Sequence, residues 1–182
     1  MRADAERSIA AILDAAVPVL ADRPEAGMGE IAKAAGVARQ TVYAHFSSRE
    51  ALLNAVAERA LAQTLAAIDA AEPERGEASE ALERLTTAWW GSVARHARVL
   101  EALAAAAPTR EDVHAFHAPV LARVAALAAR GDFDGPPAWL ATAFLALMHA
   151  AADEVAAGRL TEQEAGDALR VSIPRLFGSV HL

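Results

Sequence analysis

The chain has 182 residues, of which 54% are hydrophobic and 23% are charged, and its formal net charge is −7 at pH 7. A chain of this length and composition can bury a core, which argues against intrinsic disorder, and the absence of cysteine excludes disulfides, thiolate catalysis and cysteine-based metal sites. The acidic net charge argues against a protein that coats nucleic acid over its whole surface, but it permits a local basic surface.

Alanine occupies 50 of the 182 positions, and no segment alternates as a strand does, so an all-α fold is predicted. The first helix is expected over residues 4–21. Apolar side chains recur there at three- and four-residue spacing, from Ile9 to Leu20, which is typical of one buried helix face. Pro18 lies inside this segment and predicts a kink. Residues 23–27 are expected to form a loop.

Two short helices are predicted next, over residues 28–35 and 39–45. Gly36 lies between them and can adopt the positive φ that a tight turn requires. Two helices joined by so short a turn cross steeply and are held together by apolar side chains. The residues at those positions are Ile31, Ala35, Val37 and Val42.

The outward side chains of the second short helix are polar or aromatic, and such side chains suit base edges and phosphates in a major groove. We therefore predict a helix-turn-helix that reads DNA. The alternative is an ordinary alanine-rich hairpin whose outward side chains are merely solvated. The side chains concerned are Arg39, Gln40, Thr41 and Tyr43.

The remainder of the chain is also predicted to be helical. Residue pairs with the spacing of a capping box mark three helix starts: Ser47 with Glu50, Thr109 with Asp112, and Thr161 with Glu164. The apolar stripe from Leu82 to Leu100 can be one helix or two, which gives about nine helices in total. The further helices are expected near residues 47–71, 82–100, 109–130, 137–157 and 161–177.

The run from Ile31 to Leu53 contains Tyr43-Ala-His45-Phe46, followed by a basic residue and Glu-Ala-Leu-Leu. It resembles the signature of the TetR (tetracycline-repressor-like) transcriptional regulators, and the resemblance covers about residues 5–55. It implies a helix-turn-helix DNA-binding domain at residues 1–52 and a helical effector-binding and dimerisation domain at residues 53–182.

The resemblance implies a non-enzymatic function for the chain. The expected protein is a cytoplasmic homodimer that binds a palindromic operator in double-stranded DNA and represses transcription. A small-molecule effector, apolar or aromatic, is expected to release it from DNA. No cofactor and no metal are expected.

The resemblance also assigns roles to individual residues. The start of the second short helix is expected to meet bases, while Tyr43 and His45 are expected to meet the phosphate backbone, although His45 can instead pack beside Phe46. Arg49 stands where the family usually has lysine and keeps the charge of a phosphate contact. The full set of expected DNA-binding residues is Lys33, Arg39, Gln40, Thr41, Tyr43, His45 and Arg49.

Three positions depart from the family pattern. Ala44 occupies a site that often holds a larger side chain, so one contact is expected to be missing. Met28 and Gly29 replace the serine or threonine that commonly begins the helix before the turn. That replacement weakens both a helix cap and a phosphate contact.

The C-terminal part carries no catalytic motif. Large and polar side chains in its alanine-rich background suit an apolar effector pocket, although an ordinary core would also use them. The candidate pocket residues are Trp89, Val93, His96, Phe116, His117, Val120, Phe144 and Met148. The last two helices are expected to form the dimer interface, unless they are buried within one subunit. The candidate interface residues are Leu140, Leu147, Ala151, Leu169, Ile173 and Leu176.

Two other classes of protein are weighed against the regulator. Glu111 and His114 have the spacing of a helical iron ligand pair, which would suit a helical-bundle enzyme or metalloprotein, but no second copy of the motif exists. Residues 135–152 are uncharged and could suit a membrane-associated protein. However, this segment opens with two prolines, and a buried helix explains it better. Neither alternative accounts for residues 28–53.

Overall fold

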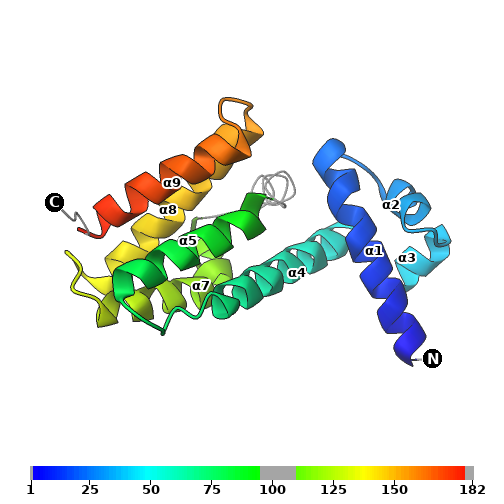
Figure 1. Cartoon of the computed structure of the whole chain (residues 1–182). Helices are drawn as coiled ribbons and strands as arrows, with labels where there is room; N and C mark the ends of the chain where they lie inside the picture. The colour runs from blue at the N-terminus through cyan, green and yellow to red at the C-terminus, as the bar shows by residue number, and fades with distance from the viewer. Residues whose placement is uncertain (1, 95–109, 179–182) are drawn as a thin grey trace. The chain divides into compact units, whose positions relative to one another are not determined.

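The computed structural model describes residues 2–94 and 110–178, and all regular structure in these ranges is helical (Figure 1). The predicted all-α fold is confirmed. The part of the apolar stripe beyond residue 94, where a second helix was left open, lies outside the described residues. The eight described helices are α1 (Arg2–Asp22), α2 (Met28–Ala34), α3 (Arg39–His45), α4 (Arg49–Ala70), α5 (Ala78–Ala94), α7 (Arg110–Arg130), α8 (Pro137–Ala156) and α9 (Glu162–Leu176).

The described residues divide into two compact units. The N-terminal unit holds residues 2–60, and the C-terminal unit holds residues 61–94 and 110–178. The division therefore falls within α4, which begins in the first unit and ends in the second. It lies further along the chain than the boundary after residue 52 that the family resemblance implies.

The N-terminal unit is built around one apolar cluster to which α1, α2, α3 and α4 all contribute. The inward face of α1 supplies side chains at the spacing of one helix face, which is why the first helix folds onto the others. Met28 and Ile31 supply the face of α2, and Val42 supplies the single buried side chain of α3. The buried cluster comprises Ile12, Leu13, Ala16, Leu20, Met28, Ile31, Ala32, Val42, Phe46, Leu52, Leu53 and Val56.

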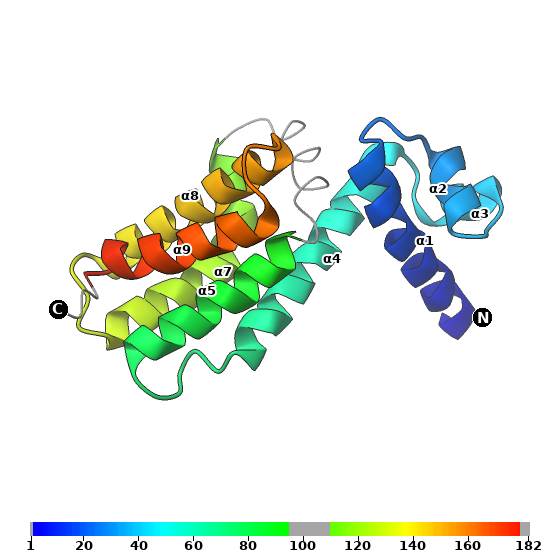
Figure 2. The same ribbon diagram turned by 45° about the horizontal axis from the view of Figure 1, so that its top comes forward.

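The C-terminal unit is a bundle in which α8 packs on α7 and α9, and α5 packs on α7 and α9 (Figure 2). Its interior is aromatic: Trp89 of α5 stacks on Phe144 of α8 with ring centroids 5.0 Å apart, and Phe177 meets Phe144 edge-on. Trp90 donates from Nε1 to the carbonyl oxygen of Glu162 at 3.0 Å, which fixes α5 against the start of α9. The rings of Trp89, Phe144 and Phe177 are all buried.

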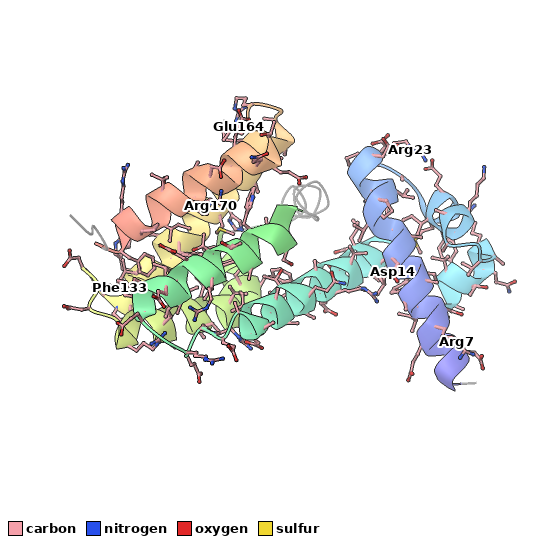
Figure 3. The ribbon with its side chains drawn as sticks, viewed as in Figure 1. Arg7, Asp14, Arg23, Phe133, Glu164 and Arg170 are labelled. Carbon is pink, nitrogen blue, oxygen red and sulfur yellow. The ribbon has the colours of Figure 1, made fainter. Side chains whose placement is uncertain are left out.

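The capping box predicted at the last helix is confirmed. The backbone N–H of Glu164 donates to Thr161 Oγ1 at 3.2 Å, and the backbone N–H of Thr161 donates to Glu164 Oε2 at 2.8 Å. Figure 3 shows Glu164 near the beginning of α9. The hydrogen bond from the Thr161 amide lowers the pKa of the Glu164 carboxyl below its usual value, because it stabilises the charged form.

The predicted capping box at the fourth helix is corrected by one residue. Ser48, rather than Ser47, caps α4, because the Ser48 hydroxyl accepts the backbone N–H of Ala51 at 3.1 Å. Ser48 therefore occupies the position before the first turn, and Arg49 becomes the first helical residue.

None of the helices in the described ranges combines the length and the hydropathy that a membrane-spanning segment needs.

Candidate nucleic-acid interface

The turn between α2 and α3 closes with the hydrogen bonds of a Schellman motif. The Val37 N–H donates to the Ala32 carbonyl at 3.0 Å, and the Gly36 N–H donates to the Lys33 carbonyl at 3.3 Å. Gly36 adopts a φ of 68°, as the sequence predicted for this turn. The motif stops α2 and starts the turn that leads to α3, so the backbone itself fixes the crossing of the two helices.

Replacing Gly36 with alanine should lower the free energy of unfolding by about 1–2 kcal/mol, the cost of a left-handed conformation for a residue with a Cβ atom. A Cβ added at Gly36 would have no atom within 4 Å of it, so the cost comes from the backbone alone. Thermal or urea unfolding of both proteins measures it. Gly91→Ala is the control: its Cβ also meets open space, but it lies inside α5 and should stabilise the protein by about 0.5–1 kcal/mol. Equal effects at both sites would contradict the assigned conformation.

The first turn of α2 is held by Glu30. Gly27 precedes the helix, and its backbone N–H donates to Glu30 Oε2 at 3.0 Å. Arg23 also forms an ion pair with Glu30, and Figure 3 shows Arg23 at the end of α1. The Gly27 amide first, and Arg23 second, lower the pKa of Glu30 below its usual value. Glu30 thus supplies one half of a capping box where the sequence lacks serine or threonine.

Because the pKa of Glu30 is lowered in the folded protein, its stabilising effect is present above the usual pKa of 4.5 and is lost as the pH falls through the folded value. Glu30→Gln should therefore lower the melting temperature at pH 7, and the difference from the unaltered protein should shrink as the pH is lowered. Melting curves between pH 7 and pH 3 measure this difference. Glu58→Gln, on the exposed surface of α4, is the control and should change the melting temperature little. A Glu30→Gln difference that stays constant down to pH 3 would contradict the cap.

The outward face of α3 agrees with the sequence prediction at three of its four positions. Arg39 and Gln40 are exposed, Thr41 is half-buried, and Tyr43 keeps 43% of its surface exposed, whereas Val42 is buried. Arg39 Nη2 donates to Tyr43 Oη at 3.4 Å, and the guanidinium carbon lies 5.4 Å from the centre of the Tyr43 ring. The two side chains therefore form one exposed cation–π pair along the helix.

The three other expected DNA contacts, Lys33, His45 and Arg49, differ in exposure and in hydrogen bonding. Lys33 is exposed on α2, and its ammonium group has no hydrogen bond or ion pair within the described ranges. His45 is half-buried, with its ring edge-on to Phe46 at 6.5 Å between centroids, so it also packs. Arg49 is half-buried and donates from Nε to the carbonyl oxygen of Ala26 at 3.2 Å. Ala44 is exposed, which leaves that position of α3 without a polar side chain.

Most of the remaining described arginines of the N-terminal unit are paired with carboxylates. Arg7 pairs with Asp4, and Arg59 of α4 pairs with Asp14 of α1 at 2.6 Å. A guanidinium that is paired with a carboxylate offers little net charge to a phosphate. The described cationic side chains of this unit that have no carboxylate partner are Lys33, Arg39 and Arg49.

Five of the eight candidate pocket residues are buried in the interior of the C-terminal unit, where Trp89 and Phe144 stack on each other. Phe116 and His117 of α7 are half-buried, and the His117 ring lies 5.0 Å from the ring of His149 on α8. His96 lies outside the described residues. The five buried residues are Trp89, Val93, Val120, Phe144 and Met148.

The candidate interface residues divide between the core and its border. Three of them, Leu140, Leu169 and Ile173, have at most 3% of their surface exposed within this subunit, so they offer almost no surface to a second copy. Ala151 is buried as well, while Leu147 and Leu176 are half-buried. The large hydrophobic side chains that are exposed on the same two helices are Trp139 at 61% and Val171 at 51%. Neither was predicted from the sequence, because neither belongs to the apolar stripe that identifies the buried face.

In the part of the chain that the structure describes, no three histidine or acidic side chains come close enough together to hold a metal ion. The side chains of Glu111 and His114, which the sequence offered as a ligand pair, lie outside the described part.

Residues 12–56 match the family described as bacterial regulatory proteins, tetR family. The matched segment begins in α1 and ends in α4, and it contains α2, the turn and α3. The chain is also 48% identical over 80 residues to the HTH-type transcriptional repressor LfrR of Mycolicibacterium smegmatis. That alignment covers 44% of this chain and 42% of the relative, so it spans less than half of either protein.

Solved structures extend the similarity over the whole chain. The TetR-like transcriptional regulator LfrR from Mycobacterium smegmatis, in complex with proflavine, is 32% identical with a TM-score of 0.71, and the match covers 97% of this chain and 98% of that one. The fatty acid degradation regulator FadR from Bacillus halodurans shares the fold, with a TM-score of 0.78 at 20% identity over 94% of this chain and 98% of that one. Identity and coverage of this extent show that the chain belongs to the TetR family of bacterial regulatory proteins.

Proposed function

We propose that this protein is a transcriptional repressor that binds an operator in double-stranded DNA through α3 and leaves it when a small molecule binds the C-terminal unit. The observation that carries the proposal is the exposed face of α3, where Arg39, Gln40 and Tyr43 stand on a helix anchored by one buried residue, Val42. Such side chains can donate to and accept from base edges in a major groove. A bacterial protein with this role works in the cytoplasm, where the chromosome lies.

The two units have different roles in this function. The N-terminal unit reads DNA, and the C-terminal unit binds the effector and a second copy of the chain. A helix of seven residues contacts few bases, so one α3 alone gives little specificity. Two copies held about 34 Å apart can read successive major grooves of a palindrome. Family membership of the whole chain supports this arrangement over a helical-bundle enzyme or a membrane-associated protein.

We place the contact between copies on the outward faces of α8 and α9. Their exposed apolar surface includes Trp139 and Val171, and small residues beside them let helices approach closely: Ala146, Ala150 and Ala168 are all exposed. The core-facing residues first expected at the interface would instead support these helices from inside. The proposed contact face of α8 and α9 therefore consists of side chains that the core of the subunit does not bury.

Replacing Val171 with glutamate should convert the dimer to a monomer, raising the dimer dissociation constant by at least about tenfold, because an unpaired carboxylate is costly to bury. Sedimentation equilibrium measures the change. Ala126→Glu, which introduces the same charge at an exposed position of α7, is the control and should remain dimeric. Val171→Glu that dimerises as tightly as the unaltered protein would remove α9 from the proposed interface.

The effector we propose is apolar or aromatic. The C-terminal unit supports this with a buried set of side chains that includes Trp89, Phe144 and Met148. The similar LfrR structure contains proflavine, a planar aromatic molecule. Titrating this protein with proflavine while following tryptophan fluorescence, and then repeating the titration with operator bound, tests the effector class. Binding that releases the operator is expected, and proflavine binding without release would contradict the switch.

Selection of bound sequences from random DNA by the purified protein tests the proposed function as a whole. The expected result is a palindrome whose half-sites are about one helical turn apart, or a multiple of it. Enrichment of single half-sites would contradict the dimer. No enrichment at all would contradict operator binding.

A further inference from the structure

Arg49 is the first residue of α4, yet its side chain turns back toward the loop between α1 and α2. Its Nε donates to the carbonyl oxygen of Ala26 at 3.2 Å, and its Nη2 donates to the carbonyl oxygen of Pro24. A cation in the first turn of a helix meets the positive end of the helix dipole. Two carbonyl oxygens, each with a partial negative charge, offset that unfavourable position.

The segment that Arg49 holds leads directly into the DNA-reading helices. Ala26 is 1% exposed and precedes Gly27, the N-cap residue of α2. On its other side the loop is closed by the Ala26 N–H, which donates to the Arg23 carbonyl at 2.9 Å. The hydrogen-bonded turn at Gly36 in turn fixes α3 relative to α2. The Arg49 side chain thus links the start of α4 to the start of the helix-turn-helix.

We propose that Arg49 is a positioning residue that fixes the helix-turn-helix against the start of α4. Two of its five guanidinium N–H groups, one on Nε and one on Nη2, bind the carbonyl oxygens of Ala26 and Pro24. Lysine carries a compact ammonium and does not present its donors in this fixed planar fork. The inference rests on the proposed function, because what Arg49 positions is a helix that reads an operator.

The consequence is selectivity for the spacing between half-sites. Inserting one base pair rotates one half-site by about 35° relative to the other, so a dimer with rigidly held reading helices should bind the longer site at least about tenfold more weakly. Arg49→Ala loosens the hold, and its affinity for the two spacings should differ by less than about threefold. Fluorescence anisotropy with the selected operator and with a variant one base pair longer measures both ratios.

Salt dependence and the conservative variant separate positioning from phosphate binding. If Arg49 bound a phosphate in each subunit, its removal would lower the slope of log affinity against log salt concentration by about 1.8 per dimer. We expect no such change in Arg49→Ala, and we expect Arg49→Lys to remain poorly selective for spacing. A reduced salt slope with spacing selectivity intact, or full rescue by Arg49→Lys, would overturn the proposal.

Arg59→Ala is the matched control, because Arg59 also lies on α4 but pairs with Asp14 of α1 rather than with the loop. It should keep the spacing selectivity of the unaltered protein, and equal loss in both variants would overturn a specific role for Arg49. Amide hydrogen exchange provides a test without DNA: in Arg49→Ala the hydrogen-bonded amides of Ala26 and Gly27 should exchange faster, while those in the middle of α1 stay protected. Unchanged exchange at these two amides would refute the inference, whereas failure to select any operator would refute only the proposed function.

Discussion

Arg39→Ala should weaken operator binding by about 1–3 kcal/mol at each half-site, and by about 2–6 kcal/mol for a dimer if the two sites contribute independently. The guanidinium is exposed, and within the described part of the chain it has a hydrogen bond only with Tyr43, at 3.4 Å. An exposed cation–π pair contributes about 0.5–1 kcal/mol, less than a bidentate bond to guanine, so DNA can draw Arg39 away from Tyr43. Anisotropy at fixed salt measures the weakening.

The comparison with Lys33→Ala shows whether Arg39 reads a base. Lys33 is exposed on α2, and its removal should weaken binding to all DNA sequences alike and lower the salt slope by about 0.9 per subunit. Arg39→Ala should instead weaken binding mainly to the selected operator and relax its preference at one base pair. A uniform weakening across sequences would make Arg39 a phosphate contact, and unchanged affinity would remove it from the interface.

Trp89→Ala should lower the free energy of unfolding by about 3–5 kcal/mol. Trp89 is 2% exposed and stacks on Phe144 with an interplanar angle of 19°, so its removal would leave a cavity between α5 and α8. Urea unfolding followed by circular dichroism measures the effect. A destabilisation of this size would show that the ring supports the core whether or not an effector also touches it.

Two further variants define what Trp89 contributes. Trp89→Phe keeps an aromatic ring against Phe144 and should cost less than Trp89→Ala. A double-mutant cycle with Phe144→Ala should give a coupling free energy of about 0.5–1.5 kcal/mol from the stacked pair. A cost below about 1 kcal/mol for Trp89→Ala would contradict the tightly packed interior.

Much of the DNA-reading unit could be predicted because its signals are local. The position of Gly36, the polar face from Arg39 to Tyr43 and the buried Val42 all follow from residues close to one another in the chain. The helices of the C-terminal unit were also expected, and Thr161 with Glu164 forms the predicted cap. Local hydrogen bonds and helix periodicity do not depend on the rest of the chain, so the sequence carries them directly.

Other features became visible only when distant segments met. The family resemblance implies a phosphate contact for Arg49, whereas in the structure its side chain donates to the carbonyl oxygens of Pro24 and Ala26, far earlier in the chain. The apolar stripes of α8 and α9 predict burial without naming a partner, and the structure buries Leu140, Leu169 and Ile173 in the core of their own subunit.

Periodicity therefore determined which helix faces avoid water and where DNA could be read. Only tertiary packing decided what covers each face and leaves Trp139 and Val171 exposed, because the hydrophobic effect is non-directional and does not specify a partner.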